Sequence, residues 1–202
     1  MLLGLYTFFV QRRLRKTHPY QAQMPVICVG NLSVGGVGKT PVCLALGQFL
    51  RDKGQKFYYL NHGYKARQQS VLVDVHTHTA VDVGDEALLL ALQAPTIVDS
   101  MRARGAQLAE KLKAQLLIMD DGFQNPSLVK TLSFVVVDGA LGFGNERVLP
   151  AGPLREPVLS GLTRADAVIL VGDDTWGVQN YLKSYGVDIP VLTGRFMQDE
   201  NV

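Results

Sequence analysis

The chain has 202 residues, of which 47% are hydrophobic and 19% are charged, and its formal net charge is +2. This length suits one α/β domain with a substantial core, and the composition excludes a disordered chain. A small net charge, without a basic stripe that carries interleaved aromatic residues, argues against a nucleic-acid partner. Cys28 and Cys43 have no CxxC partner, so we interpret them as buried, reduced thiols.

The N-terminus places an apolar run before a basic one. Residues 1–10 read MLLGLYTFFV and residues 11–16 read QRRLRK. The apolar run is half as long as the ~20 residues that a membrane-spanning helix needs. The basic residues come after the apolar run, whereas in a secretory signal they come before it. Residues 1–20 therefore predict an amphipathic, hydrophobic helix that associates with a membrane surface through anionic head groups. The alternative is an N-terminal helix that packs on its own domain.

Short apolar strands alternate with helices along the rest of the chain. We expect strands at 25–30, 56–61, 69–75, 95–99, 115–122, 132–139, 165–172 and 189–196, and helices at 40–54, 84–93, 100–114 and 175–186. Ser100 is expected to cap the helix that it opens. The alternation predicts an α/β fold over residues 21–202: a three-layer domain of the phosphate-loop NTPase type with a mostly parallel sheet. The strand at 69–75 is expected at an edge.

A glycine-rich segment, GNLSVGGVGKTP, lies between the first predicted strand and the first predicted helix. It departs from the usual phosphate-loop pattern G-x-x-x-x-G-K-[ST] because Ser33 occupies the position of the first glycine in that pattern. Serine is compatible with that position only if its φ is not positive. The residues expected to hold ATP are Ser33, Val34, Gly35, Gly36, Val37, Gly38, Lys39 and Thr40.

The chemistry of this loop follows from its residue types. Glycines let backbone N–H groups turn toward phosphate oxygens, Lys39 would reach the terminal phosphates, and Thr40 would bind Mg²⁺. Val34 replaces the lysine that defines the partition and cell-division ATPases, which argues against that group. A chance glycine cluster is the remaining alternative.

Pairs of acidic residues stand at two further places. LLIMDDG ends in Asp120 and Asp121, and an acid at the end of an apolar strand is typical of the carboxylate that faces Mg²⁺ in phosphate-loop enzymes. A surface turn is the alternative. Asp85 and Glu86 open a predicted helix, where acids also simply stabilise the helix dipole. Because ligands bind beyond the carboxyl ends of parallel strands, we expect the strand-end residues to line one rim.

Five stretches occur in a characteristic order: VGNLSVGGVGKTP, HGYKAR, HTAVDVGDEALLLA, MDDGFQNPSL and VVDGALGFGNERVLPAGPLREP. Together they resemble the tetraacyldisaccharide 4'-kinase family, which phosphorylates the lipid A precursor at the inner membrane. DDGFQ and LPAGPLREP are the most specific of them, and a small residue such as Ser33 opens that family's loop. The resemblance implies ATP and Mg²⁺ as cofactors. It implies a lipid A disaccharide precursor and the inner-membrane surface as partners, without an obligate protein partner, on the cytoplasmic face of the bacterial inner membrane.

The resemblance also implies roles for the matching residues. The implied catalytic residues are Asp85, as general base, Lys39 and Asp121. Those implied at the metal are Thr40, Glu86 and Asp120, and those implied at the substrate are Tyr64, Gln124, Arg155 and Glu156. A carboxylate that accepts a proton makes a sugar hydroxyl a better nucleophile, and cations offset the charge that spreads over the moving phosphoryl group.

Three departures from the family pattern affect the expected activity. His62 replaces an arginine and is mostly neutral at pH 7, and Ala87 replaces a proline of the first helical turn. Relatives continue beyond the position of Val202 and carry a histidine there that assists the base. We therefore expect the family's C-terminal third to be absent, ATP to bind nearly normally, and transfer to the lipid to be poor.

The expected function is ATP-dependent phosphorylation of the 4'-hydroxyl of a tetraacyl glucosamine disaccharide 1-phosphate. Two alternatives stay open. One is a nucleotide-binding module of the same family with impaired catalysis, which His62 favours and the intact Lys39 and Asp120 oppose. The other is a soluble phosphate-loop switch ATPase, which Val34 and the N-terminal apolar run oppose.

Overall fold

The structure, a computed structural model, describes residues 18–197 and divides them into two compact units. The β1–β5 unit contains residues 18–30 and 39–133, and the β6–β8 unit contains residues 31–38 and 134–197. The membrane-associating helix predicted within residues 1–20 falls almost wholly outside the described residues. Among residues 18–197, no helix combines the length and the apolar character that crossing a bilayer requires.

The strands of the β1–β5 unit are short and mostly parallel. They are β1 (Val26–Gly30), β2 (Tyr58–Asn61), β3 (Val71–Leu72), β4 (Thr96–Val98) and β5 (Leu117–Asp120), in the spatial order β3-β4-β2-β5-β1. Only β3 runs antiparallel, beside β4. Every residue of β1, β4 and β5 is buried, as expected for strands that helices cover on both faces. The predicted α/β class, the parallel sheet and the edge strand are confirmed.

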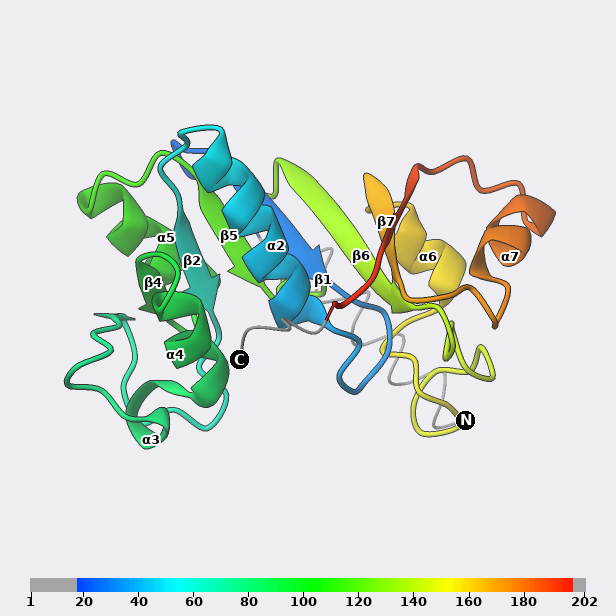
Figure 1. Cartoon of the computed structure of the whole chain (residues 1–202), viewed down its shortest axis with the longest axis horizontal. Helices are drawn as coiled ribbons and strands as arrows, with labels where there is room; N and C mark the ends of the chain where they lie inside the picture. Colours follow the sequence, from blue (N-terminus) through cyan, green and yellow to red (C-terminus); the bar gives the residue numbers. More distant parts are fainter. Residues whose placement is uncertain (1–17, 198–202) are drawn as a thin grey trace. The chain divides into compact units, whose positions relative to one another are not determined.

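Four helices accompany these strands: α2 (Lys39–Asp52), α3 (Ala80–Val83), α4 (Asp85–Ala91) and α5 (Arg102–Lys111). Helix α2 packs on β1 and β5, and it also contacts α4, which covers β2 and β4 (Figure 1). In the sheet, the connections from β1 to β2 and from β2 to β4 run toward the β3 edge, whereas the connection from β4 through α5 to β5 runs back toward β1. Right-handed crossovers therefore place α2 and α4 on one face of the strands and α5 on the other.

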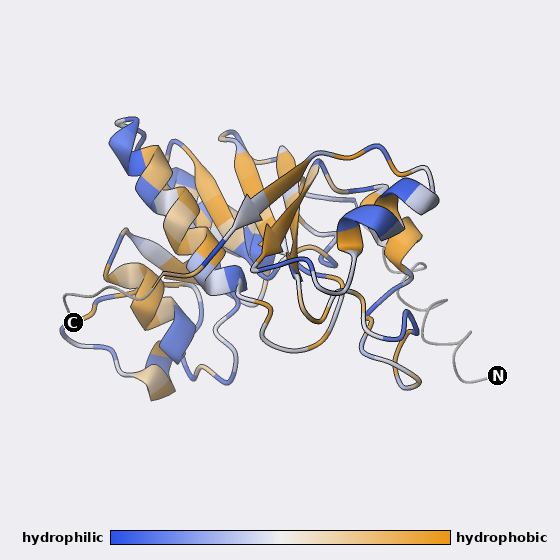
Figure 2. Ribbon diagram, turned by 45° about the vertical axis from the view of Figure 1, so that its right-hand side comes forward, coloured by the Kyte–Doolittle hydropathy of each residue, from blue (hydrophilic) through white to orange (hydrophobic). Residues whose placement is uncertain are grey.

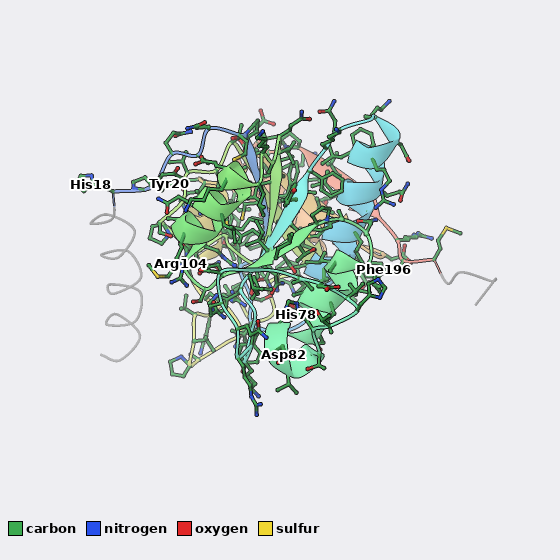
Figure 3. The ribbon with its side chains drawn as sticks, turned by 90° about the vertical axis from the view of Figure 1, so that its left-hand side faces the viewer. His18, Tyr20, His78, Asp82, Arg104 and Phe196 are labelled. Carbon is green, nitrogen blue, oxygen red and sulfur yellow. The ribbon has the colours of Figure 1, made fainter. Side chains whose placement is uncertain are left out.

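The start of α5 corrects one prediction. Ser100 does not cap the helix, which begins two residues later at Arg102. The carboxylate of Asp99 accepts the N–H of Met101 at 2.7 Å instead. Asp99 is fully buried, and Arg104, labelled in Figure 3, donates to it through Nε at 2.7 Å and Nη2 at 2.9 Å. The prediction of a serine cap was wrong because a buried, paired carboxylate supplies the acceptor one residue earlier.

The β6–β8 unit contains three parallel strands, β6 (Leu132–Asp138), β7 (Ala167–Val171) and β8 (Val191–Gly194), and two short helices, α6 (Val158–Leu162) and α7 (Val178–Ser184). Helix α6 was not predicted. Helix α7 begins where the Asp174 carboxylate accepts three successive backbone N–H groups, from Gly177 to Gln179. Figure 2 shows that the strands of both units are mostly hydrophobic, whereas the helices carry hydrophilic sides.

Candidate active site

The glycine-rich loop has the backbone that its pattern predicts. Gly35 and Gly38 adopt φ values of 110° and 84°, which side chains disfavour. A Cβ added at Gly35 would meet no atom within 4 Å, so this glycine serves the backbone turn and not close packing. Ser33 is not among the described non-glycine residues with positive φ. Serine is therefore compatible with the first loop position, as the sequence condition required.

A second segment holds this loop from within the β6–β8 unit. The N–H of Val34 donates to the carbonyl of Pro153 at 2.8 Å, and the N–H of Arg155 donates to the carbonyl of Leu32 at 2.7 Å. Ser33 and Leu154 form an antiparallel bridge between these contacts. The proline-rich loop therefore braces the glycine-rich loop, a role that the sequence did not reveal.

Two residues predicted at the substrate belong to this brace. The side chain of Glu156 is buried, and both of its oxygens lie 2.8 Å from Nη2 of Arg164. Arg155 is half-buried and contributes its backbone to the brace. Both residues therefore anchor the loop, and their contact with a substrate stays a prediction.

Lys39 and Thr40 begin α2 in the β1–β5 unit, directly after the loop. The Thr40 hydroxyl donates to Oδ2 of Asp120 at 3.2 Å, across 80 positions of sequence. Nζ of Lys39 lies 3.9 Å from Oδ1 of Asp121. Four residues that the sequence singled out therefore come together where α2 begins and β5 ends.

The carboxylate of Asp120 is the least solvated acid of this group. Asp120 is 1% exposed, and its Oδ1 has no hydrogen-bond partner among the described residues. Burial above all, and then the carboxylates of Glu86 and Asp121, raise its pKa to about 6, although Lys39 and Thr40 act in the opposite direction. A buried acid whose oxygen is unpartnered is stabilised by a cation or a proton.

This donor set fits Mg²⁺. Mg²⁺ prefers oxygen ligands, and phosphate-loop proteins hold it with one hydroxyl and one or two carboxylates, the other ligands being phosphates and waters. The Thr40 hydroxyl and the orphaned oxygen of Asp120 supply such donors. Within residues 18–197, no three His, Cys, Asp or Glu side chains cluster closely enough to hold a metal unaided. With these two oxygen donors, the other ligands of a Mg²⁺ ion would be phosphates and waters, as in phosphate-loop proteins.

Asp85 and Glu86 form the exposed first turn of α4. Oδ1 of Asp85 accepts the N–H of Glu86 at 2.9 Å. Asp85 therefore makes a local contact at the helix N-terminus, as an acid that only stabilises the helix would. Glu86 also raises the pKa of Asp120, which indicates that the two carboxylates interact. The role of Asp85 as a base and of Glu86 at the metal stays a prediction.

The residues around Tyr64 were predicted to border the substrate. Tyr64 is 72% exposed, and Nζ of Lys65 lies 5.3 Å from the centre of its ring. Burial, followed by the nearby Arg102 guanidinium, lowers the pKa of His62, so its ring is neutral at pH 7 as expected. Gln124 is half-buried just beyond the acidic pair. Contacts of Tyr64 and Gln124 with a substrate stay predictions.

Sequence reasoning missed two buried polar residues at this site. Arg102 is 1% exposed, and its Nη2 donates to the carbonyls of Asp120 and Asp121 at 2.9 Å each. It thereby holds the strand end at which Asp121 adopts a φ of 50°. Asn61 closes β2 and donates to Oδ2 of Asp120 at 3.1 Å. The only signal for Asn61 in the sequence is a polar residue at the end of an apolar strand.

Comparison with known proteins connects this site to one family. The model of the tetraacyldisaccharide-1-P 4'-kinase (LpxK) family matches residues 1–200. The chain is 50% identical over 195 residues to a tetraacyldisaccharide 4'-kinase of Rhodospirillum centenum, covering 96% of this chain and 57% of that protein. It is also 50% identical over 198 residues to the enzyme of that name from Gluconacetobacter diazotrophicus, covering 98% and 59%. The chain thus spans less than two thirds of the length of these curated relatives.

A solved structure agrees with this match. The crystal structure of LpxK from Aquifex aeolicus in complex with ATP aligns with a TM-score of 0.74 at 25% sequence identity, covering 99% of this chain and 84% of that one. The fold, the motif order and the family model therefore point the same way. The chain belongs to the tetraacyldisaccharide-1-P 4'-kinase family.

Proposed function

We propose that this protein transfers the γ-phosphoryl group of ATP to the 4'-hydroxyl of a tetraacyl glucosamine disaccharide 1-phosphate, a lipid A precursor. The observation that carries the proposal is the buried Asp120 carboxylate, which has the Thr40 hydroxyl on one oxygen and no partner among the described residues on the other. Relatives that are 50% identical and named tetraacyldisaccharide 4'-kinase support the same activity.

In this proposal the two ends of the phosphate loop divide the binding of ATP. Backbone N–H groups of the loop other than that of Val34, which donates to Pro153, would surround the phosphates, and Lys39 would add a positive charge. Thr40, Asp120 and Glu86 are the residues that would hold Mg²⁺, which, when bound, neutralises charge on the phosphate oxygens. Asp121 lies 3.9 Å from the Lys39 ammonium group and would keep it oriented.

The acceptor would be bound and activated by other residues. Asp85 is exposed at the start of α4 and would accept the proton of the sugar hydroxyl. Substrate contacts are proposed for Tyr64, Gln124, Arg155 and Glu156. Such positioning matters because the hydroxyl must approach the phosphorus in line, and a misplacement of about 1 Å costs about 10²-fold in rate.

The proposed location is the cytoplasmic face of the bacterial inner membrane. ATP is a cytoplasmic substrate, and the lipid acceptor lies in the bilayer. We propose that residues 1–20 associate with the membrane surface and that residues 21–202 form the kinase domain. The basic run at 11–16 supports this assignment, since anionic head groups attract lysine and arginine by about 1 kcal/mol per residue.

The proposal is tested by phosphate transfer from radiolabelled ATP to a tetraacyl disaccharide 1-phosphate in detergent micelles. Lys39→Ala removes the main cation on the phosphates, so we expect calorimetry to show at least tenfold weaker Mg-ATP binding and transfer to disappear. The matched control is Lys56→Ala, an exposed lysine before β2, at the opposite strand end from Asn61. Equal ATP affinity of Lys39→Ala and the control would remove the loop from the proposal, whereas ATP binding without any transfer would favour the non-catalytic alternative.

A further inference from the structure

Asn61 links two parts of the site through one side chain. It is the last residue of β2, it is 3% exposed, and it lies beside Asp120 because Leu60 pairs with Met119 in the parallel register. Nδ2 of Asn61 donates to Oδ2 of Asp120 at 3.1 Å, and Oδ1 of Asn61 accepts the N–H of Gly63 at 2.7 Å. The same amide group therefore contacts the proposed metal carboxylate and the loop that carries Tyr64.

The orientation of this amide is determined by its two partners. A backbone N–H only donates and an ionised carboxylate only accepts, so the Oδ1 atom must face Gly63 and the Nδ2 atom must face Asp120. Turning the amide over would lose both hydrogen bonds. Asp120 likewise cannot rotate its carboxylate without lengthening the contacts of Oδ2 with Asn61 and with Thr40.

The loop on the other side of Asn61 is tightly packed. Gly63 has a φ of 65°, and a Cβ at this position would lie 2.4 Å from Cγ1 of Val98 and 3.0 Å from Cβ of Ala66. A Cβ at Gly84 would lie 3.6 Å from the carbonyl oxygen of Tyr64 and 3.7 Å from Cα of Gly63. Gly84 thus has room for a methyl group beside the loop, and it is Ala66 that packs against the cluster containing Val83 and Ala87 around the start of α4. Because Gly63 and Ala66 are closely packed, a movement of Asn61 would be passed on to Tyr64 and toward α4.

We propose that Asn61 is a positioning residue that couples the Asp120 carboxylate to the acceptor side of the site, which comprises residues 62–65 and the start of α4. The inference rests on the proposed function, since it assigns Asp120 to Mg-ATP and Tyr64 with Asp85 to the acceptor. Binding of Mg-ATP at Asp120 then orders residues 62–65 before the acceptor arrives.

Two substitutions separate coupling from a merely structural role. Asn61→Asp keeps an oxygen for the Gly63 N–H but replaces the donor to Asp120 by a second acceptor. Asn61→Leu removes both hydrogen bonds at similar volume. If Asn61 only stabilised the loop, Asn61→Asp would keep the nucleotide-dependent slowing of exchange in the loop, whatever its affinity for the nucleotide. The control is Asn180→Asp, which makes the same change at an exposed position of α7.

The experiment is hydrogen exchange of the peptide covering residues 62–66, measured in the 202-residue chain with and without Mg²⁺ and a non-hydrolysable ATP analogue. We expect the Mg-nucleotide to slow exchange of the Gly63 and Tyr64 amides by up to about tenfold in the unmodified protein and in Asn180→Asp, since a fixed hydrogen bond from Gly63 to the neutral Oδ1 of Asn61 is worth up to about that factor. In Asn61→Asp and Asn61→Leu the slowing should fall below about twofold. Calorimetry on the same samples measures nucleotide binding.

The outcomes distinguish the inference from the function on which it rests. If Asn61→Asp binds the Mg-nucleotide and still slows its loop tenfold, the coupling is overturned while the proposed function stands. The same holds if the unmodified protein binds the Mg-nucleotide and its loop does not respond. If the unmodified protein binds no Mg-nucleotide, the proposed function is overturned and the coupling with it. If Asn61→Leu does not fold, Asn61→Asp decides the question.

Discussion

At the scale of single residues, Asp120 carries a charge that the folded protein disfavours. Burial, followed by the Glu86 and Asp121 carboxylates, raises its pKa from 3.8 to about 6. Between about pH 4 and pH 6 the folded state therefore binds more protons than the unfolded state, and the free energy of unfolding falls as the pH rises through this window. The difference between the two pKa values corresponds to about 3 kcal/mol. Such a cost is understandable where a cation is to be bound.

Asp120→Asn should therefore stabilise the protein while impairing its function. Without metal or nucleotide at pH 7, we expect the free energy of unfolding to rise by roughly 1–3 kcal/mol, because the neutral amide avoids the buried charge. Urea unfolding at pH 4.5, 6 and 7 should show a flatter pH dependence than in the unmodified protein. Mg²⁺ should no longer strengthen ATP binding. A variant that is less stable at pH 7 and keeps the original pH dependence would contradict this assignment.

Asp85→Asn separates a catalytic base from a helix-terminal acid. The amide still accepts the N–H of Glu86, a contact that Asp85 makes at 2.9 Å, so thermal stability should hardly change. It cannot accept a proton, so turnover with the lipid acceptor should fall by about 10²-fold or more. Melting temperature and phosphate transfer are measured on the same preparation. Early melting with full specific activity would show that Asp85 acts only on the helix.

At the scale of elements, the proline-rich loop supports the phosphate loop. Its backbone contacts Leu32 and Val34, and the buried carboxylate of Glu156 with the Arg164 guanidinium secures the end of the loop against α6. Because this support is made by backbone groups and a buried ion pair, it holds the glycine-rich segment without contributing side chains to the phosphate-binding surface. The proline-rich loop thus contributes to the site by holding the phosphate loop in place.

Arg164→Ala tests this support. Removing one partner of a buried ion pair leaves the other charge less compensated, and we expect a loss of about 2 kcal/mol, below the usual 3–5 kcal/mol because Arg164 is one-third exposed. ATP affinity should fall several-fold as the brace loosens. Adding Glu156→Gln removes the buried charge and should recover part of the stability in urea unfolding. A double variant as unstable as the sum of the two single variants would mean that the pair does not act as a unit.

At the scale of the whole molecule, each unit by itself contains some of the residues to which the family resemblance gives a role. Ser33 to Gly38, Arg155 and Glu156 belong to the β6–β8 unit, whereas Lys39, Thr40, Asp85 and Asp120 belong to the β1–β5 unit. Within the β1–β5 unit, Asp120 ends β5 and Lys39 and Thr40 begin the helix that follows the phosphate loop, as is general for ligand sites of parallel α/β sheets. The proposed membrane-associating segment lies before both units in the chain.

Deleting residues 1–16 tests the proposed membrane association. We expect the shortened protein to be released from vesicles that contain anionic lipid, and we expect salt to weaken binding of the intact chain because the attraction is partly electrostatic. Replacing Arg12, Arg13, Arg15 and Lys16 by glutamine keeps the apolar run and should remove only the salt-dependent part. Vesicle flotation at low and high salt measures both effects. Association that is absent, or insensitive to salt, would contradict an interfacial anchor.

The sequence by itself determined the parallel α/β fold, the phosphate-loop segment and the family, because each of these is encoded by short, contiguous patterns. Apolar runs specify buried strands, and glycines before a lysine and a threonine specify one turn of backbone. It also predicted, from their residue types and their places at the ends of elements, that Thr40 and Asp120 bind the same ion, and this stays a prediction. These inferences needed no knowledge of which strands pair.

Only the tertiary structure decided the surroundings of those residues. Asn61 lies 59 positions from Asp120, and Pro153 lies far along the chain from Val34, so strand register and loop docking alone bring them together. The same holds for the acceptor at the start of α5. Asp99, and not Ser100, accepts the backbone N–H there, because the Arg104 guanidinium compensates the burial of its charge. Burial and hydrogen-bond partners depend on contacts between distant segments, and a local pattern does not record them.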